Sequence, residues 1–169
     1  MPSAKQVMAR FDRLDNETER NNFKTIWQDA TDYVHIRRNE IISRKQKGSQ
    51  RTEKVYDSTA IRSNDLLASS LQGSLTSNSA LWAKIKIAGD DFNSDDAVRG
   101  WLDGTSTAMF RAFNDSNYTL EMAEFFLDLT SVHTACVLIE EDTIEKRGFN
   151  GLNFRAYPIM DYVFEENHK

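Results

Sequence analysis

Apolar and polar residues follow the period of an α-helix over the first two thirds of the chain. Apolar side chains recur at spacings of three and four residues, which places them on one face of a helix. Ser3 with Gln6 has the spacing of a capping box, in which each side chain binds the backbone N–H of the other residue. Asn16 with Glu19 repeats that spacing. We therefore expect a short helix over the first 15 residues and a long amphipathic helix after it.

Three further helices are predicted after a polar stretch. Residues 39–53 have no apolar period and are expected to form a long exposed loop. Asp57, Ser94 and Ser116 each carry a side-chain oxygen that can cap the helix following it. The last two helices are close in sequence, so we expect an αα-hairpin. The first of the three is expected to bury a stripe made of Ile61, Leu67, Ala68, Leu71 and Leu75.

The last third of the chain has the patterns of β-strands, and one earlier segment shares them. Residues 81–87 alternate between apolar side chains and a lysine-bearing side, which predicts a half-buried strand. Residues 135–139 are continuously apolar, as in a strand covered on both faces. Residues 152–157 and 162–166 alternate again. The predicted fold class is α+β: N-terminal amphipathic helices and an αα-hairpin, followed by a small, mostly antiparallel sheet.

We expect one domain, because domain sizes cluster near about 100 to 150 residues and the chain has 169. Within it we expect a short N-terminal helix over 1–15, a mainly helical part over 16–132 and a mainly strand part over 133–169. The chain stops just after a predicted strand that has no closing partner, so we expect more sequence to follow it. The expected core includes Trp27, Trp101, Phe126 and Leu138.

Composition narrows the class of protein. Apolar residues make up 40% of the chain and charged residues 28%, which excludes collagenous, low-complexity and disordered chains. The longest apolar run, residues 135–139, is far shorter than the ~20 residues of a membrane-spanning helix, and no secretory signal precedes it. We therefore expect a soluble, cytoplasmic protein with no membrane contact. The single cysteine, Cys136, excludes an internal disulfide, and no metal or other cofactor is expected.

Charge is unevenly distributed along the chain. The net charge is −5, which argues against a protein whose main task is to bind nucleic-acid phosphates. Residues 37–54 nevertheless carry seven basic and two acidic residues, and residues 90–103 carry five aspartates and one arginine. Such runs are usually solvated surface; alternatively, they meet between neighbouring copies in a head-to-tail contact. The candidate interface or DNA-facing residues are Arg37, Arg38, Arg44, Lys45, Lys47, Trp82, Asp90, Asp91, Asp95 and Asp96.

Two acidic segments resemble metal sites only in part. Residues 91–96 begin like a calcium-binding EF-hand loop, but Asp96 and Leu102 stand where that loop needs glycine and glutamate. Helix capping explains this segment better. Residues 140–142 with Glu145 could hold a divalent cation for nuclease chemistry, yet no lysine or histidine lies at a matched spacing. A charge cluster at the end of a strand is the simpler interpretation.

Two side chains have competing interpretations. Cys136 lies three residues after His133, which would suit a nucleophile and its base, but its apolar strand favours a small buried side chain. Trp82 lies on the lysine side of its predicted strand. It can therefore pack inside the protein or anchor an interface, and the sequence leaves both open.

Several segments, taken in order, resemble the head-to-tail connector (portal) proteins of podovirus-type tailed phages. The resemblance extends from about residue 21 to residue 166. The chain departs from the family pattern at 35–38, where the family often has proline, and at His133, where it often has glycine. The segments that carry the resemblance are 55–60, 66–76, Trp82, 101–102, 116–118, 134–135 and 138–142.

The resemblance implies a structural, non-enzymatic subunit of a homo-oligomeric ring, a dodecamer, at one vertex of the viral capsid. It implies a channel for double-stranded DNA during packaging and ejection of the genome. The implied partners are the major capsid protein, the terminase large subunit, and tail or adaptor proteins. The protein would belong to the virion and be assembled in the host cytoplasm. The whole chain, 1–169, would be the N-terminal wing-like portion of a longer portal protein.

Two other classes of protein stay open as alternatives. A monomeric nucleic-acid-binding module would use the basic segment 37–54, and its affinity would fall steeply with salt. A divalent-metal nuclease would cleave DNA in a manner that depends on residues 140–142.

Overall fold

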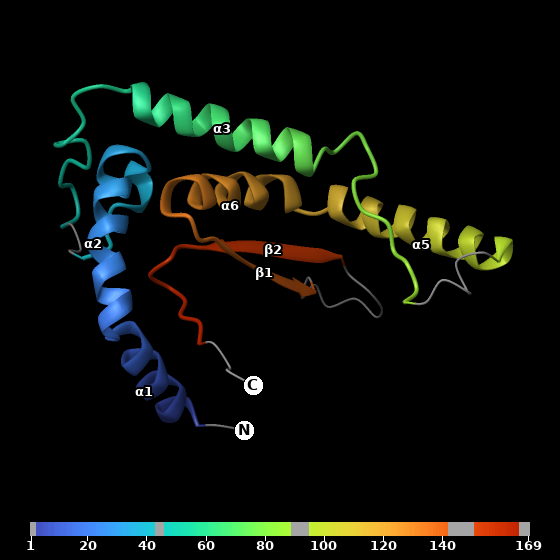
Figure 1. The fold of residues 1–169 in the computed structure, drawn as a ribbon, viewed down its shortest axis with the longest axis horizontal. Helices are drawn as coiled ribbons and strands as arrows, with labels where there is room; N and C mark the ends of the chain where they lie inside the picture. Colours follow the sequence, from blue (N-terminus) through green and yellow to red (C-terminus); the bar gives the residue numbers. More distant parts are fainter. Residues whose placement is uncertain (1–2, 43–45, 89–94, 142–150, 166–169) are drawn as a thin grey trace. The chain divides into compact units, whose positions relative to one another are not determined.

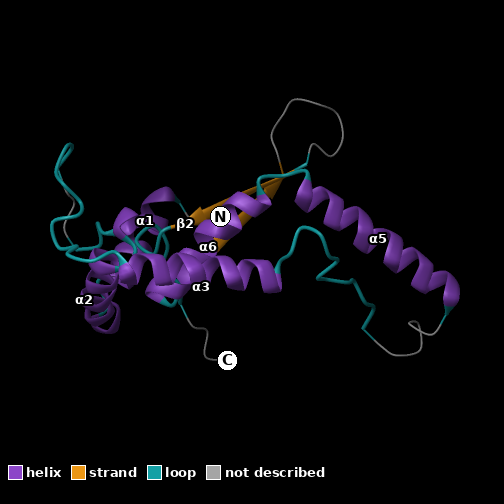
Figure 2. Ribbon diagram, turned by 90° about the horizontal axis from the view of Figure 1, so that it is seen from above, coloured by secondary structure: helices purple, strands orange, loops and turns teal. Residues whose placement is uncertain are grey.

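The computed structural model describes residues 3–42, 46–88, 95–141 and 151–165. These residues form five α-helices, one short 3-10 helix and a two-stranded antiparallel sheet, shown in Figure 1 and, by type of element, in Figure 2. The α+β class is therefore confirmed. The elements are α1 (Ala4–Asp15), α2 (Thr18–Tyr33), η1 (Ile36–Arg38), α3 (Thr59–Leu75), α5 (Asp96–Asn114), α6 (Tyr118–Val132), β1 (Cys136–Glu141) and β2 (Leu152–Tyr157).

Some helix starts follow their expected caps. The backbone N–H of Ser3 donates to Gln6 Oε1 over 2.8 Å, which completes the capping box of α1. Ser116 Oγ accepts from the N–H of Tyr118 over 3.1 Å at the start of α6. The side chain of Asp57 accepts from the N–H of Thr59 over 3.2 Å. These caps are local, so the sequence alone is enough to predict them.

Two of the expected caps were wrong. Asn16 is the C-cap of α1, and α2 begins after Glu17, which makes no side-chain capping bond. The N-cap of α5 is Asp95, whose side chain accepts from the N–H of Ala97 over 2.8 Å, instead of Ser94, which lies outside the described residues. A carboxylate at this position satisfies a free N–H and also faces the positive end of the helix dipole.

The residues cluster into two compact units. Unit 1 contains Met1–Ala68, Phe125–Cys136 and Tyr157–Lys169, and unit 2 contains Ser69–Glu124 and Val137–Ala156. Helices α3 and α6 therefore each contribute residues to both units.

The core of unit 1 joins four segments that are far apart in sequence. It contains Trp27 of α2, Ile41, Val132 of α6 and Ile159, with Tyr162 packed against it. The buried position of Trp27 is confirmed, as is that of Phe126, which is 4% exposed. Ile41 belongs to residues 39–53, the segment that was expected to be an exposed loop. That expectation was wrong at Ile41, which is buried. Residues 46–54 are exposed.

Unit 2 buries an aromatic cluster beside α5. Tyr118 and Phe154 are buried, and so is Leu102 of α5. The expected core positions of Trp101 and Leu138 were wrong, because their side chains are 65% and 38% exposed. One residue along a helix is a rotation of about 100°, so burying Leu102 turns Trp101 outward.

A short connection joins helix α5 to helix α6. The connection consists of Asp115, Ser116 and Asn117. Asn117 is bonded to β2, which fixes where α6 begins.

Several segments predicted to be strands, and several side chains predicted to be buried, differ in the structure. Residues 81–87 and 162–165 are in no strand of the described chain. β1 was expected to be covered on both faces, but its residues from 138 to 141 are exposed. On α3, Ala68 is buried as expected while Leu67 and Leu75 are more than half exposed. An alternating pattern shows that a segment suits a strand, but the strand forms only where another segment offers a ladder of hydrogen bonds.

Candidate functional site

The basic segment that follows α2 is folded onto its own unit. Arg37 and Arg38 both lie in η1, where Arg37 is exposed and Arg38 is partly buried. Lys47 is exposed. Arg44 and Lys45 lie outside the described residues.

Buried carboxylates bind two basic residues of this segment. Arg38 Nε lies 3.4 Å from Asp128 Oδ1, and His35 Nε2 lies at the same distance from the same oxygen. Lys54 Nζ donates to Asp32 Oδ2 over 2.6 Å, a bond that raises the pKa of Lys54. Asp128 and Asp32 are each 3% exposed. These contacts hold η1 and the segment after it in place, because a buried carboxylate that loses its partner is costly.

Two of the acidic candidates, Asp95 and Asp96, have local partners in unit 2. Asp95 caps α5, and Asp96 forms an ion pair with Arg99 one turn further along the helix. Both aspartates are exposed. Asp90 and Asp91 lie outside the described residues. The structure therefore gives Asp95 a definite local role in starting the helix, a role that leaves its side chain accessible.

Trp82 belongs to the aromatic cluster of unit 2. Its ring stacks on Phe113 and Tyr118, with centroids 6.0 and 5.9 Å away and interplanar angles of 17° and 10°. Phe154 meets the rings of Phe113 and Tyr118 edge-on. Trp82 is nevertheless 37% exposed. The two interpretations of this residue are thus compatible: one side of the indole packs, and another side is accessible.

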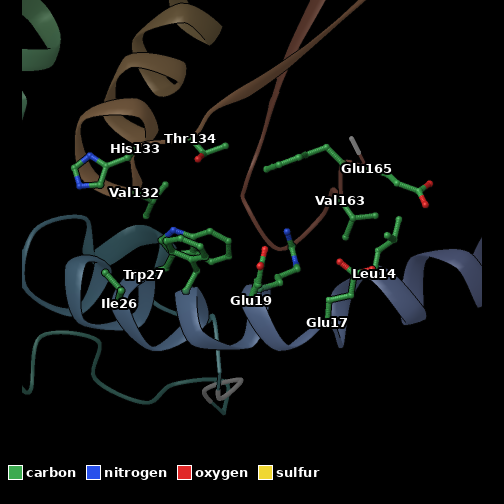
Figure 3. A pocket seen from close by; sticks show the side chains of 13 residues that line it. Leu14, Glu17, Glu19, Ile26, Trp27, Val132, His133, Thr134, Val163 and Glu165 are labelled. Atoms are coloured by element: carbon green, nitrogen blue, oxygen red, sulfur yellow. The ribbon is translucent and has the colours of Figure 1, made fainter. Parts of the chain in front are cut away.

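A cavity of about 570 Å³ lies in unit 1, where the start of α2 faces the end of α6 and the C-terminal segment (Figure 3). Its apolar walls include Trp27 and Val132, and Figure 3 shows Glu17 and Glu19 at its α2 side. It is lined by Leu14, Glu17, Glu19, Arg20, Phe23, Ile26, Trp27, Val132, His133, Thr134, Val163, Phe164 and Glu165.

Arg20 connects the helices of unit 1 to its C-terminal segment. Its Nη2 donates to the carbonyl oxygens of Ile159 and Tyr162 over 2.9 and 3.0 Å. Its Nε donates to Asp15 Oδ1 over 2.9 Å, and its guanidinium lies 5.4 Å from the centroid of Trp27. The planar guanidinium suits this role because it presents several donors in fixed directions. The amino-acid sequence gives no signal of this role of Arg20, since both carbonyls come from residues about 140 positions away.

The metal-site candidates lie only partly within the described residues. Glu140 and Glu141 are exposed on β1, while Asp142 and Glu145 lie outside the described residues. Cys136 is half-buried at the start of β1. Among the residues described, no group of three or more His, Cys, Asp or Glu side chains could hold a metal ion. None of the helices described is long and apolar enough to cross a membrane.

The family model of the bacteriophage head to tail connecting protein matches residues 4–169. The chain belongs to this family. A comparison with curated proteins gives no match. The connector is therefore a phage protein of the junction between head and tail, a component of the virion that contacts capsid and tail components.

The connector exposes several large apolar side chains on its helices. They include Trp101 of α5 at 65% and Leu120 of α6 at 68%. Exposed apolar side chains that form a contiguous patch are typical of a surface that partners cover.

Proposed function

We propose that the connector is a structural, non-enzymatic subunit of a homo-oligomeric portal ring, a dodecamer, at one vertex of a podovirus-type capsid. In this proposal the ring carries double-stranded DNA during packaging and ejection. It contacts the major capsid protein, the terminase large subunit, and tail or adaptor proteins, and it is assembled in the host cytoplasm. The described chain is the wing-like N-terminal portion of this subunit.

The observation that carries the proposal is the family match over residues 4–169, combined with the exposed apolar surface. A ring of identical subunits covers such surface by head-to-tail contacts, in which one patch of each copy meets a different patch of the next. The net charge of −5 suits a channel through which DNA must slide, because gripping phosphates requires basic side chains.

Opposite charges in the two units support the same arrangement. In this proposal, Arg37, Arg44, Lys45 and Lys47 face a neighbouring subunit, capsid protein or DNA, and the aspartates at 90, 91, 95 and 96 lie on a complementary edge. Arg38 is the exception among the basic candidates, since its side chain is already directed to Asp128. Trp82 presents its accessible side to the same kind of contact.

Native mass tests the proposal directly. The full-length protein is examined by mass photometry and negative-stain imaging at low and high salt. Rings with a central hole are expected, and a compact monomer under every condition would contradict the proposal. Charge reversal of Arg44 and Lys45 should weaken the ring, with charge reversal of Lys5, a basic residue outside this segment, as the control.

A further inference from the structure

The basic segment after α2 is tied to that helix by the side chain of Gln28. Its Oε1 accepts from the backbone N–H groups of Ile41 and Ile42 over 3.1 and 2.9 Å. Its Nε2 donates to the carbonyl oxygen of Asn39 over 3.0 Å. A side-chain amide has both donors and an acceptor, so it can bind a backbone segment as a neighbouring strand does. Gln28 therefore fixes residues 39–42 against α2.

A buried carboxylate sets the orientation of Gln28. Its Nε2 also donates to Asp32 Oδ1 over 3.0 Å, one turn further along α2. With this contact the amide uses both of its donors and both lone pairs of its oxygen. Asp32 is 3% exposed, and its other oxygen accepts from Lys54 Nζ over 2.6 Å. The same carboxylate thus connects Gln28, which binds the start of the segment, to Lys54, which lies at its end.

The two described parts of the segment, 39–42 and 46–54, are also tied to each other. Asn39 is fully buried and donates from Nδ2 to the carbonyl oxygen of Arg51 over 3.2 Å. Arg51 forms an ion pair with Glu40. Contacts of this kind remove most of the conformations that a free loop would have, so they hold residues 46–54 in a defined place.

Lys47 lies on a closed turn of this segment. The N–H of Ser49 donates to the carbonyl oxygen of Gln46 over 3.0 Å, which makes Lys47 the second and Gly48 the third residue of the turn. Gly48 has a φ of 85°, which a residue without a Cβ adopts without strain. Lys47 is exposed and forms no ion pair with a described residue. A charge on a closed turn loses less conformational freedom on binding than a charge on a free loop.

Three other basic residues of the segment pair with carboxylates of their own chain. These pairs are Arg38 with Asp128, Arg51 with Glu40, and Lys54 with Asp32. Affinity for DNA comes from several accessible cations that neutralise phosphates together. Because these three cations are directed to carboxylates of the chain itself, the described part of the segment suits a carboxylate-bearing protein surface better than DNA.

We propose that Gln28 is a positioning residue, and that the segment it holds brings Lys47 to a carboxylate-bearing surface of the neighbouring subunit. The inference rests on the proposed ring, and it specifies the partner of Lys47 and the residue that places Lys47 there. Gln28 touches no neighbour in this arrangement and acts through residues 39–42. An exposed pair of charges contributes little when both side chains are free to move, so the fixed turn is what makes the contact useful.

A double-mutant cycle tests the positioning role. Lys47→Glu and Gln28→Met, each alone, should raise the concentration at which rings dissociate by about threefold or more in mass photometry. In the Gln28→Met background, Lys47→Glu should change that concentration by less than about twofold, because the lysine is no longer held at the contact. Thr25→Met, at an exposed position about one turn earlier on α2, is the control and should leave ring formation unchanged. Full and independent effects of the two changes would overturn the inference.

Hydrogen exchange shows what Gln28→Met does to the fold. The amides of Ile41 and Ile42 lose their acceptor and should exchange about tenfold faster or more, while the amides of α6 should keep the protection of the wild type. Unchanged exchange of the two amides would overturn the inference. Where unit 1 as a whole loses protection, the cycle is run with Gln28→Glu, which keeps an oxygen for both N–H groups but loses the amide donors.

DNA binding and ring formation separate the remaining outcomes. A fluorescent DNA duplex is titrated with the full-length protein at low salt, and its anisotropy should give affinities for the wild type and Lys47→Glu that agree within about twofold. A larger loss of affinity would assign Lys47 to DNA and overturn the inference. Wild-type rings that Lys47→Glu leaves unaffected would overturn it too, and leave the proposed ring standing. A wild-type protein that forms no rings would overturn both.

Discussion

The side chain of Asn117 pairs with the backbone of Phe154 in the way that a neighbouring strand would. It donates to the carbonyl over 2.7 Å and accepts from the N–H over 2.8 Å. Asn117 immediately precedes α6, so this pair sets the start of the helix on the edge of β2. It also gives a physical reason for the segment 116–118, one of those that carry the family resemblance.

Replacement of Asn117 by alanine should destabilise unit 2. The change leaves the N–H and C=O of the buried residue Phe154 without their partner, which costs about 2 to 4 kcal/mol for two such groups. Urea denaturation followed by tryptophan fluorescence measures the free energy of unfolding. Asn22→Ala, an exposed position on α2, serves as the control and should change it by less than ~0.5 kcal/mol. Equal stability of the two variants would show that the pair contributes nothing.

Replacement of His133 by glycine should stabilise unit 1. His133 follows the last residue of α6 and has a φ of 63°, in the left-handed region that glycine adopts without strain. A gain of about 1 kcal/mol is expected, because this conformation costs a non-glycine residue roughly that much. Thermal denaturation should show the melting temperature rising for His133→Gly and falling for His133→Val. Thr134→Gly, one residue later, should lower it, which would exclude a general benefit of glycine in this turn.

Loss of the Asp128 carboxylate should destabilise unit 1 strongly. Asp128→Ala removes the buried group that faces His35 and Arg38, and breaking such a buried pair costs about 3 to 5 kcal/mol. A double-mutant cycle with Arg38→Met, measured by urea denaturation, isolates the contact. Arg38→Met should cost less in the Asp128→Ala background than in the wild type. Additive costs would mean that the two side chains are not coupled.

The ion pairs of Asp15 should make stability depend on pH in the acidic range. Burial raises the pKa of Asp15, but hydrogen bonds from Lys24 and Arg20 outweigh it, and the folded pKa lies below the ordinary value of 3.8. A carboxyl with a lowered pKa contributes stability above its unfolded pKa and loses it as the pH falls through the folded pKa. The advantage of the wild type over Asp15→Asn in urea denaturation should therefore be full at pH 6 and shrink below pH 4. An advantage that does not change with pH would contradict the assignment.

Trp101 should matter for assembly and hardly for folding. Its side chain is 65% exposed on α5, so Trp101→Ser should change the free energy of unfolding by less than about 1 kcal/mol. In a ring that buries the Trp101 side of α5 between subunits, Trp101→Ser should weaken ring formation at least tenfold. Tryptophans buried in an interface are frequent anchors of that interface. Mass photometry checks this, with Tyr56→Ser at a 95% exposed site as the control.

The amino-acid sequence by itself determined the positions of the helices, some of their caps and part of the core, because these features depend on local interactions. The helical period located the helices, and residues such as Ser3 and Ser116 cap them through contacts within three positions. Trp27 and Phe126 were identified as core because they lie on apolar helix faces that are in fact covered. The ordered segments were enough to indicate the family.

Tertiary structure decided which predicted faces are covered and which polar side chains meet. Trp101 and Leu138 have the pattern of core residues, yet no described segment covers them. Residues 81–87 have the pattern of a strand but form none in the described part of the chain. The contacts of Asp128, Arg20 and Asn117 join residues from 37 to about 140 positions apart. Spacing along a chain reports the shape of one element, whereas burial and pairing depend on the element that arrives from elsewhere, and only the folded chain specifies that.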